Sequence, residues 1–288
     1  SASMNFKNFS DGSTGKTVAM GNSVYFTGAG ETDGGLNVNV SYELDQGAAN
    51  NSGSNFDNHF VSVGNDTLGT LTVHGHGGAN SAAALDGTAA GDLWDNTLMN
   101  TDAALATRAA PFASTSGDNL MVYSLPTMID GLAIAGSYQA ANTTGSGSSA
   151  YGLTYTGVDG LSVSYGSGES SGVLATSGDQ NIYKASYVYG SLTVGASYNE
   201  FDSSLNSNDQ EVSSFGISYT VSDEISVSFG EEIIDRADQH SDIEVSGISV
   251  AYTTGGMTVS AAQTEAKNSD YTASMDRELW NIGLSFAF

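Results

Sequence analysis

The chain has 288 residues with 36 glycines, 2 prolines and no cysteine, and its 32 acidic against 7 basic side chains give a formal net charge of -25. This balance excludes nucleic acid as a partner, because binding to phosphates needs clustered lysines and arginines. No segment reaches 18 consecutive apolar residues, so a transmembrane helix is also excluded. The chain begins at Ser1 without a basic stretch and an apolar core, and we expect that a signal peptide has already been removed.

Apolar and polar residues alternate in short segments along the whole chain. This period of two is typical of β-strands whose two faces meet different surroundings. It predicts sixteen strands at residues 4–9, 18–27, 36–44, 56–63, 70–76, 119–124, 132–138, 151–156, 161–165, 182–189, 192–198, 212–221, 225–230, 243–252, 257–263 and 278–288. The mean hydropathy of -0.15 does not exclude a membrane location, because a barrel strand turns only every second residue towards lipid.

Short turns alternate with longer polar loops between these strands. Turns at 32–35, 157–160 and 253–256 contain Asp-Gly or Gly-Gly pairs, which supply the positive φ angles of tight hairpins. Short turns at one rim and long loops at the other are typical of a membrane barrel. The sequence therefore predicts one domain over residues 1–288, an all-β fold that is a 16-stranded antiparallel transmembrane β-barrel with both termini at the short-turn rim.

The two faces of the predicted strands differ in polarity. In the last strand Trp280, Ile282 and Leu284 share one face, and small or polar residues share the other. A soluble sandwich would bury the apolar face, but most acids lie in the connections, and a near-neutral belt favours contact between the apolar face and lipid. Outward tyrosines would form interfacial girdles. Asn8, Asn22 and Ser62 on the outward face of early strands indicate either contact with sister subunits or inexact strand boundaries.

The longest connection covers about residues 77–118 and is the third long loop. A loop of this length is uncommon in a compact protein and is usually functional or disordered. A sixteen-stranded barrel leaves an open channel that has room for it. We therefore expect this loop to fold inwards.

Several segments resemble the general, trimeric porins of Gram-negative outer membranes. Residues 31–36, Glu-Thr-Asp-Gly-Gly-Leu, are similar to that family's first periplasmic turn, and residues 60–64 and 68–73 resemble the hairpin before its constriction loop. Residues 123–126 and 130–132 resemble the strand and turn after that loop. The terminal Phe288, with Trp280 and Phe286 before it, matches the family's outer-membrane assembly signal. The resemblance covers essentially the whole chain and implies a homotrimer in contact with outer-membrane lipids and lipopolysaccharide.

The resemblance also implies a constriction. In the family the third loop narrows the pore and presents acids across from wall arginines. The implied constriction residues are Asp86, Asp92, Asp95, Asp102 and Arg108.

The predicted wall departs from the family pattern. Val122 stands where an arginine often precedes the tyrosine of the sixth strand, and a His-Gly-His segment stands where an arginine often closes the fifth. The expected pore-wall residues are Lys7, Glu43, His74, His76 and Lys184. Since few wall cations oppose the loop acids, we predict a cation-preferring pore. The net charge alone leaves two interpretations open, solvated acidic loops and a vestibule that attracts cations.

Two groups of residues have side chains that could bind a metal. His74 and His76 share one strand face, but a third ligand is missing nearby in sequence, so we interpret them as rim or lumen residues. The densest acidic cluster contains the candidate calcium ligands Glu231, Glu232, Asp235 and Asp238. Calcium there would bridge loops or lipopolysaccharide, and a solvated acidic loop is the alternative. No other cofactor is expected.

The function that the sequence favours is passive diffusion of small hydrophilic solutes and cations. No catalytic constellation stands out among the many serines and acids, so an enzyme is not expected. Two alternatives stay open. One is a substrate-specific outer-membrane channel with a binding site in its lumen. The other is a structural or adhesive extracellular β-protein similar to a surface-layer subunit.

Overall fold

The computed structural model describes residues 2–9, 16–21, 23–44, 56–93, 118–141, 147–172 and 177–286. Within these ranges it contains one antiparallel sheet and three short 3-10 helices. The strands are β1 (Ala2–Phe9), β2 (Lys16–Gly21), β3 (Val24–Glu31), β4 (Asn37–Leu44), β5 (Phe56–Asn65), β6 (Gly69–His76), β7 (Leu120–Ser124), β8 (Leu132–Gln139), β9 (Gly147–Tyr155), β10 (Leu161–Ser171), β11 (Gly178–Tyr189), β12 (Leu192–Ser203), β13 (Gln210–Thr220), β14 (Ile225–Arg236), β15 (Ile243–Thr254), β16 (Met257–Lys267) and β17 (Arg277–Phe286). The 3-10 helices are η1 (Ala83–Leu85), η2 (Asn206–Asn208) and η3 (Ser269–Tyr271).

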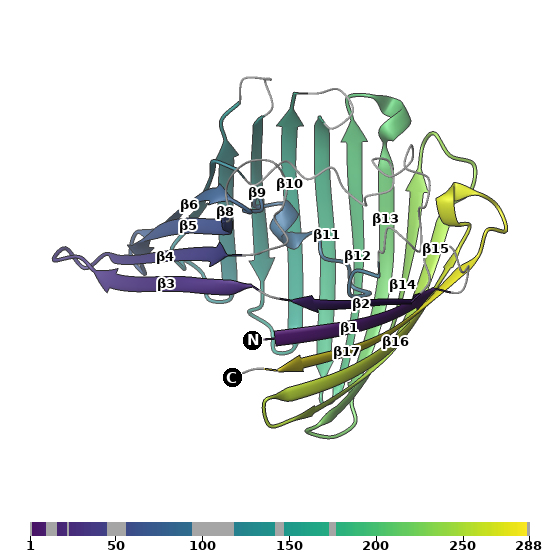
Figure 1. Ribbon diagram of the computed structural model, residues 1–288. Helices are drawn as coiled ribbons and strands as arrows, with labels where there is room; N and C mark the ends of the chain where they lie inside the picture. The colour runs from purple at the N-terminus through teal and green to yellow at the C-terminus, as the bar shows by residue number, and fades with distance from the viewer. Residues whose placement is uncertain are drawn as a thin grey trace.

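The strands pair in chain order, and β1 pairs with both β2 and β17. β2 ends at Gly21 and β3 begins at Val24, and both overlap one predicted strand, at 18–27. Counting them as one gives the predicted sixteen strands. The described residues of β2 pair with β1 and those of β3 pair with β4, so neither half joins both neighbours. Figure 1 accordingly shows a strongly curved sheet that stays open at this break, with the two termini close together.

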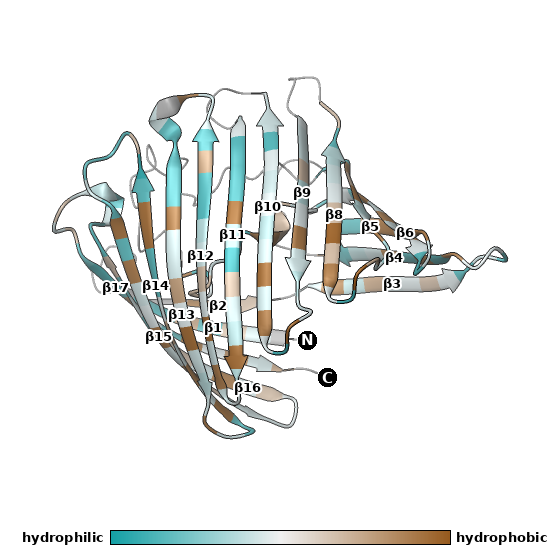
Figure 2. Ribbon diagram, turned by 180° about the vertical axis from the view of Figure 1, so that it is seen from behind, coloured by the Kyte–Doolittle hydropathy of each residue, from teal (hydrophilic) through white to brown (hydrophobic). Residues whose placement is uncertain are grey.

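Several strands run further than predicted. β10 continues to Ser171 and β14 to Arg236, whereas alternation predicted ends at 165 and 230. The β10 extension has only polar residues on its outer face, and the β14 extension has Glu231 and Asp235 there beside Ile233. Figure 2 shows hydrophilic upper ends on β11–β14. The hydrogen-bonded ladder continues beyond the apolar belt, where the hydropathy pattern that marks a half-buried strand has stopped.

The predicted faces are confirmed. On β13, Phe215 and Tyr219 point outwards and are about half exposed, while Val212 and Gly216 lie buried on the inner face. The same faces continue on the next strand. The outward Phe215 is paired with Glu231 of β14, and the inward Gly216 is paired with Gly230. Cross-strand partners share a face, so a single parity assignment holds from strand to strand.

Outward tyrosines form a row across four neighbouring strands. Ring centroids are 6.0 Å apart for Tyr151 and Tyr165, 5.1 Å for Tyr165 and Tyr183, and 6.4 Å for Tyr183 and Tyr198. Such a row suits the interface between acyl chains and headgroups. Among the residues that the structure describes, no helix is long and apolar enough to cross a membrane.

Of the three polar residues predicted on the outer face of the early strands, one faces inwards. Asn8 lies on the outer face, opposite Trp280, as predicted. Ser62 does not, because its hydroxyl accepts a hydrogen bond of 3.4 Å from Asn39 on the inner face. Strand alternation from the exposed Val61 places Ser62 inwards. Asn22 lies outside the described residues.

Candidate functional site

The segment after β6 runs along the inner face of the sheet, and we call its described part, residues 77–93, the inward loop. The backbone N–H of Ser81 donates to Ser137 Oγ on β8 at 2.8 Å. The N–H of Ala89 donates to Ser214 Oγ on β13 at 2.9 Å and to Ser197 Oγ on β12 at 3.2 Å. These bonds span six strands, so the third long loop folds inwards as predicted.

The first half of the inward loop is ordered by Asn80. Its side-chain oxygen accepts hydrogen bonds from the N–H groups of Ala82 at 3.0 Å and Ala83 at 2.7 Å, which starts η1. An asparagine that binds the backbone two and three residues ahead favours this kind of turn. Ala82 then packs with Ile182 on the inner face of β11, and Leu85 packs against the same cluster.

The second half contains a tight turn between Thr88 and Asp92. The N–H of Thr88 donates to Asp92 Oδ1 at 2.6 Å, and the N–H of Asp92 donates to Thr88 Oγ1 at 2.9 Å. Gly91 and Asp92 both have positive φ, a conformation that glycine adopts freely and aspartate tolerates better than most residues. The reciprocal bonds fix the backbone on either side of these two residues.

Two wall residues hold the loop carbonyls. Lys184 Nζ donates to Gly87 O, and Asn199 Nδ2 donates to Asp86 O at 2.9 Å. Lys184 was predicted to lie on the pore wall and Asp86 on the loop, and the structure brings both to one place. Asn199 is fully buried there.

Electrostatics around Asp86 follow from this packing. Burial is the main cause that raises the pKa of the Asp86 carboxyl to about 6, and repulsion from Asp92 adds to it. The charge of Lys184 acts in the opposite direction. Two carboxylates and one ammonium group therefore share a small region of the inner face.

Glu232 is the main wall contact of the loop. It is fully buried, and its Oε1 accepts hydrogen bonds from Thr88 Oγ1 and, at 2.9 Å, from the N–H of Leu93. Its Oε2 has no hydrogen-bond partner among the described residues. The candidate calcium ligand is thus bonded to the loop backbone.

The other candidate calcium ligands are not gathered around Glu232. Strand alternation turns Glu231 and Asp235 to the outer face. Asp238 is paired with Arg236, with an Nε–Oδ1 distance of 2.9 Å. Within the described ranges no group of three or more His, Cys, Asp or Glu side chains is placed to hold a metal.

Two of the remaining predicted wall residues lie on strands that do not hold the inward loop, Glu43 on β4 and Lys7 on β1. Glu43 is buried and accepts hydrogen bonds from Tyr25 at 2.6 Å and Asn58 at 2.5 Å. Lys7 lies on β1, opposite Asn281 of β17.

The two histidines lie at the base of the inward loop. The His74 ring lies 5.5 Å from that of Phe60. His76 Nε2 lies 3.6 Å from a carboxylate oxygen of Asp118, at the far end of the long connection.

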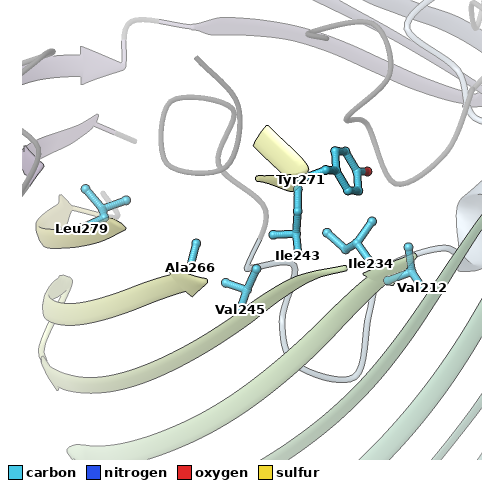
Figure 3. Close-up of a cluster of buried hydrophobic side chains, with 7 residues drawn as sticks. All are labelled: Val212, Ile234, Ile243, Val245, Ala266, Tyr271 and Leu279. Carbon is cyan, nitrogen blue, oxygen red and sulfur yellow. The ribbon is translucent and has the colours of Figure 1, made fainter. Parts of the chain in front are cut away.

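An apolar cluster on the inner face was not predicted. Figure 3 shows side chains from β13–β17 that point into the barrel together with Tyr271 of η3. Its members are Val212, Ile234, Ile243, Val245, Ala266, Tyr271 and Leu279. Leu93 at the end of the inward loop packs against them. The inner face is therefore polar over most strands but carries a buried apolar patch that holds two loops.

A family model described as Gram-negative porin matches residues 2–244 of the chain. The chain belongs to the Gram-negative porin family. The predicted family, fold and location are therefore confirmed: this porin is a β-barrel channel protein of a bacterial outer membrane. A comparison with curated protein sequences gave no match.

Solved structures share the fold of this porin over its whole length. An anion-selective porin from Comamonas acidovorans is 16% identical, with 100% of this chain and 99% of that chain covered and a TM-score of 0.69. The trimer form of OmpT, an outer membrane protein of Vibrio cholerae, is 15% identical, with 99% and 96% covered and a TM-score of 0.71. A mutant of Rh. blastica porin is 15% identical, with 100% and 98% covered and a TM-score of 0.69. At these identities the likeness concerns the fold alone.

Asp95, Asp102, Arg108 and Phe288 lie outside the described residues. Of the predicted assembly signal, Trp280 is 50% exposed on the outer face of β17, and Phe286 pairs with Ala2 at the closing β1–β17 contact.

The sequence did not identify the anchors of the inward loop. Ser197, Ser214, Asn199 and Glu232 all have inner parity, but alternation predicted it only for Ser197 and Ser214, because Asn199 and Glu232 lie beyond the predicted strands at 192–198 and 225–230. Their contacts with the loop depend on how far it travels around the wall, and no local pattern encodes that path. The one available signal was Glu232 itself, a carboxylate on the inner side of a strand that an acidic loop approaches.

Proposed function

We propose that this porin is a passive diffusion channel for small hydrophilic solutes and ions and that it prefers cations. The observation that carries the proposal is the inward loop, which holds Asp86 and Asp92 against the inner wall. A loop inside the barrel reduces its open cross-section, and fixed carboxylates beside the opening raise the local concentration of cations. Passive diffusion needs neither a cofactor nor an energy source.

The inner face supports a water-filled passage. Serine and threonine hydroxyls meet across neighbouring strands, with oxygen distances of 2.8 Å for Thr154 and Ser164 and 2.7 Å for Ser228 and Ser249. Such a wall offers donors and acceptors to water and to polar solutes. It favours general diffusion of hydrophilic molecules.

Most described cations are already engaged. Arg236 pairs with Asp238, and Arg277 pairs with Asp270 at 2.8 Å. Lys267 lies 3.4 Å from Glu244, on the outward parity of β15 and β16. With Lys184 bonded to a loop carbonyl, these contacts leave the acids as the dominant charge, against 7 basic residues in the whole sequence.

The proposed constriction also includes Asp95, Asp102 and Arg108, which follow the inward loop in sequence. Val122 occupies the inner parity of β7, opposite Ser137, where the family often has arginine. The absence of an arginine there weakens the field across the pore and favours cations. The Comamonas relative is named an anion-selective porin, so opposite selectivity is the rival outcome.

We further propose a homotrimer that contacts outer-membrane lipids and lipopolysaccharide. Asn8 on the outer face of β1 supports subunit contact, because a polar side chain there would be costly against acyl chains. One structural relative is described in a trimer form. Chemical cross-linking of the porin in native membranes tests this, and a species of one subunit alone would contradict it.

Reconstitution tests the diffusion channel itself. The porin in planar bilayers should give stepwise conductance, and liposomes that contain it should swell in small sugars at a rate that falls smoothly with sugar size. Replacing potassium with a bulky organic cation should lower the conductance more than replacing chloride with a bulky organic anion. Electrically silent bilayers would contradict the channel, and the reverse order of ion replacement would contradict the cation preference.

A further inference from the structure

Four glycines on the inner face of the sheet lie where the backbone of the inward loop approaches it closely. They belong to four different strands: Gly152 on β9, Gly166 on β10, Gly216 on β13 and Gly230 on β14. A Cβ atom added to Gly216 would overlap the carbonyl oxygen of Ala89, and one added to Gly152 would overlap that of Ser81. Added to Gly230 it would lie 2.6 Å from Ala90 O, and added to Gly166 it would lie 3.1 Å from the Cα atom of Ala82.

These glycines are aligned across the strands. Gly152 is directly opposite Gly166, and Gly216 is directly opposite Gly230. Gly195 of β12 continues the second row opposite Gly216, and an added Cβ there would lie 3.4 Å from the Cβ atom of Ala89. Glycine weakens a strand interior and often marks a close approach by another backbone. Here the approaching backbone is present in the structure.

Hydrogen bonds hold the loop onto this row from both sides. The N–H of Ala89 is bonded to Ser197 and Ser214, which lie two residues from Gly195 and Gly216 along their strands. Glu232, two residues beyond Gly230, accepts the bonds from Thr88 and Leu93. These hydrogen bonds hold the loop backbone against the wall. Because Gly195, Gly216 and Gly230 have no side chains, the backbone can lie in direct contact with the strands.

Gly247 of β15 continues the second row opposite Gly230, and an added Cβ there would lie 2.7 Å from the Leu93 side chain. Strand glycines away from the loop make no contact with it. An added Cβ on Gly136, whose parity is outward, would meet only Ala150 O at 3.9 Å. Gly30 on β3 would meet nothing within 4 Å among the described residues. Close approach to the inward loop is therefore found at inner-face positions beneath it, and Gly136 on β8 offers a matched control that lies outside it.

We propose that Gly152, Gly166, Gly216 and Gly230 are the positioning residues of the inward loop and thereby set the width of the channel. The inference rests on the proposed diffusion function. A methyl group at these positions pushes the loop backbone away from the wall and into the lumen. The loop is thus seated at a fixed depth, and the depth is determined by residues that lie far from it in sequence.

A graded series of alanine substitutions tests the proposal. Single-channel conductance should fall in the order of increasing overlap with the loop: Gly195→Ala, then Gly166→Ala, then Gly230→Ala, then Gly216→Ala, with a loss of roughly twofold for the last. The size limit in liposome swelling should fall in the same order. Gly136→Ala should conduct as the parent does. Each variant should migrate differently on gels before and after heating, which checks that its barrel has folded.

A compensating pair separates loop seating from damage to the barrel. An added Cβ on Gly230 would lie 2.8 Å from the Cβ atom of Ala90, so Ala90→Gly should restore part of the conductance lost in Gly230→Ala. Should Gly216→Ala not fold, Gly230→Ala and Gly166→Ala carry the test. Unchanged conductance in the folded variants, or equal losses in Gly136→Ala, would overturn the proposal. A parent protein that gives no conductance in planar bilayers would instead contradict the proposed diffusion function.

Discussion

Glu232 and Leu93 are joined by a hydrogen bond of 2.9 Å between the side-chain Oε1 atom and the backbone nitrogen. The residues are far apart in sequence, one on β14 and the other at the end of the inward loop. The same oxygen also accepts the hydroxyl of Thr88. One buried carboxylate oxygen therefore fixes both sides of the turn that carries Asp92, and the position of the loop depends on the wall.

Removing this acceptor should loosen the loop. Glu232→Leu leaves the buried N–H of Leu93 and the hydroxyl of Thr88 without their acceptor, at about 1–3 kcal/mol for each group. We expect larger current fluctuations in the open state in planar bilayers. Glu232→Gln keeps an acceptor oxygen, and its open-state current should fluctuate no more than that of the parent porin. Glu231→Leu changes the neighbouring outward position, and fluctuations as large in that variant would contradict the role of Glu232.

Asp86 should make the cation preference depend on pH. Its pKa is raised to about 6, so the folded porin holds this proton more tightly than the unfolded chain. Ionisation above about pH 6 therefore costs some stability while it adds a negative charge to the pore. Zero-current potentials should show a stronger cation preference in the parent than in Asp86→Asn at pH 8, and no difference at pH 5. The same difference at both pH values would contradict this assignment.

Tyr271 should anchor the connection between β16 and β17. Its ring is buried in the apolar inner cluster, and Tyr271→Ala removes a large buried side chain, at about 3–5 kcal/mol of local packing. We expect new protease cleavage near residues 268–276 while the barrel stays folded. Tyr271→Phe should be resistant, because the Tyr271 hydroxyl is buried and finds no partner among the described residues. Cleavage of both variants at the same rate would show that the ring does not hold this connection.

Neighbouring positions on β15 test which face meets lipid. Ile248 is 58% exposed and has outward parity, whereas Ser249 points inwards towards Ser228. Ile248→Arg should lower the free energy of unfolding in lipid vesicles by about 2–4 kcal/mol. Ser249→Arg should cost clearly less, because its charge can reach water. Urea titration of both variants measures this, and the reverse order would mean that the apolar face is a protein core.

Strand alternation predicted most of the fold. The last strand, with Trp280 and Ile282 on one face, was predicted correctly because lipid and lumen demand opposite residues at successive positions. The extension of β14 to Arg236 was not predicted, since Ile233 and Ile234 lie on opposite faces and break the pattern. The reason is physical: Ile233 points outwards, and Ile234 fills the inner apolar cluster.

The candidate site was predicted less completely. Asp86, Asp92 and Lys184 were named from sequence, and the structure places all three in one region. Glu232 was assigned to a candidate calcium site because sequence proximity suggested a cluster, whereas alternation separates it from Glu231. Gly216 and Gly230 meet the inward loop because of both the strand register and the path of the loop. Neither can be read from the pattern of residues along the sequence.

The most direct test of the account is the zero-current potential of the reconstituted porin across a potassium chloride gradient. With acids held in the lumen and most described cations paired, potassium should cross more readily than chloride. The dilute side should therefore become electrically positive. A dilute side that becomes negative would show a preference for chloride and would contradict the proposed origin of selectivity in the inward loop.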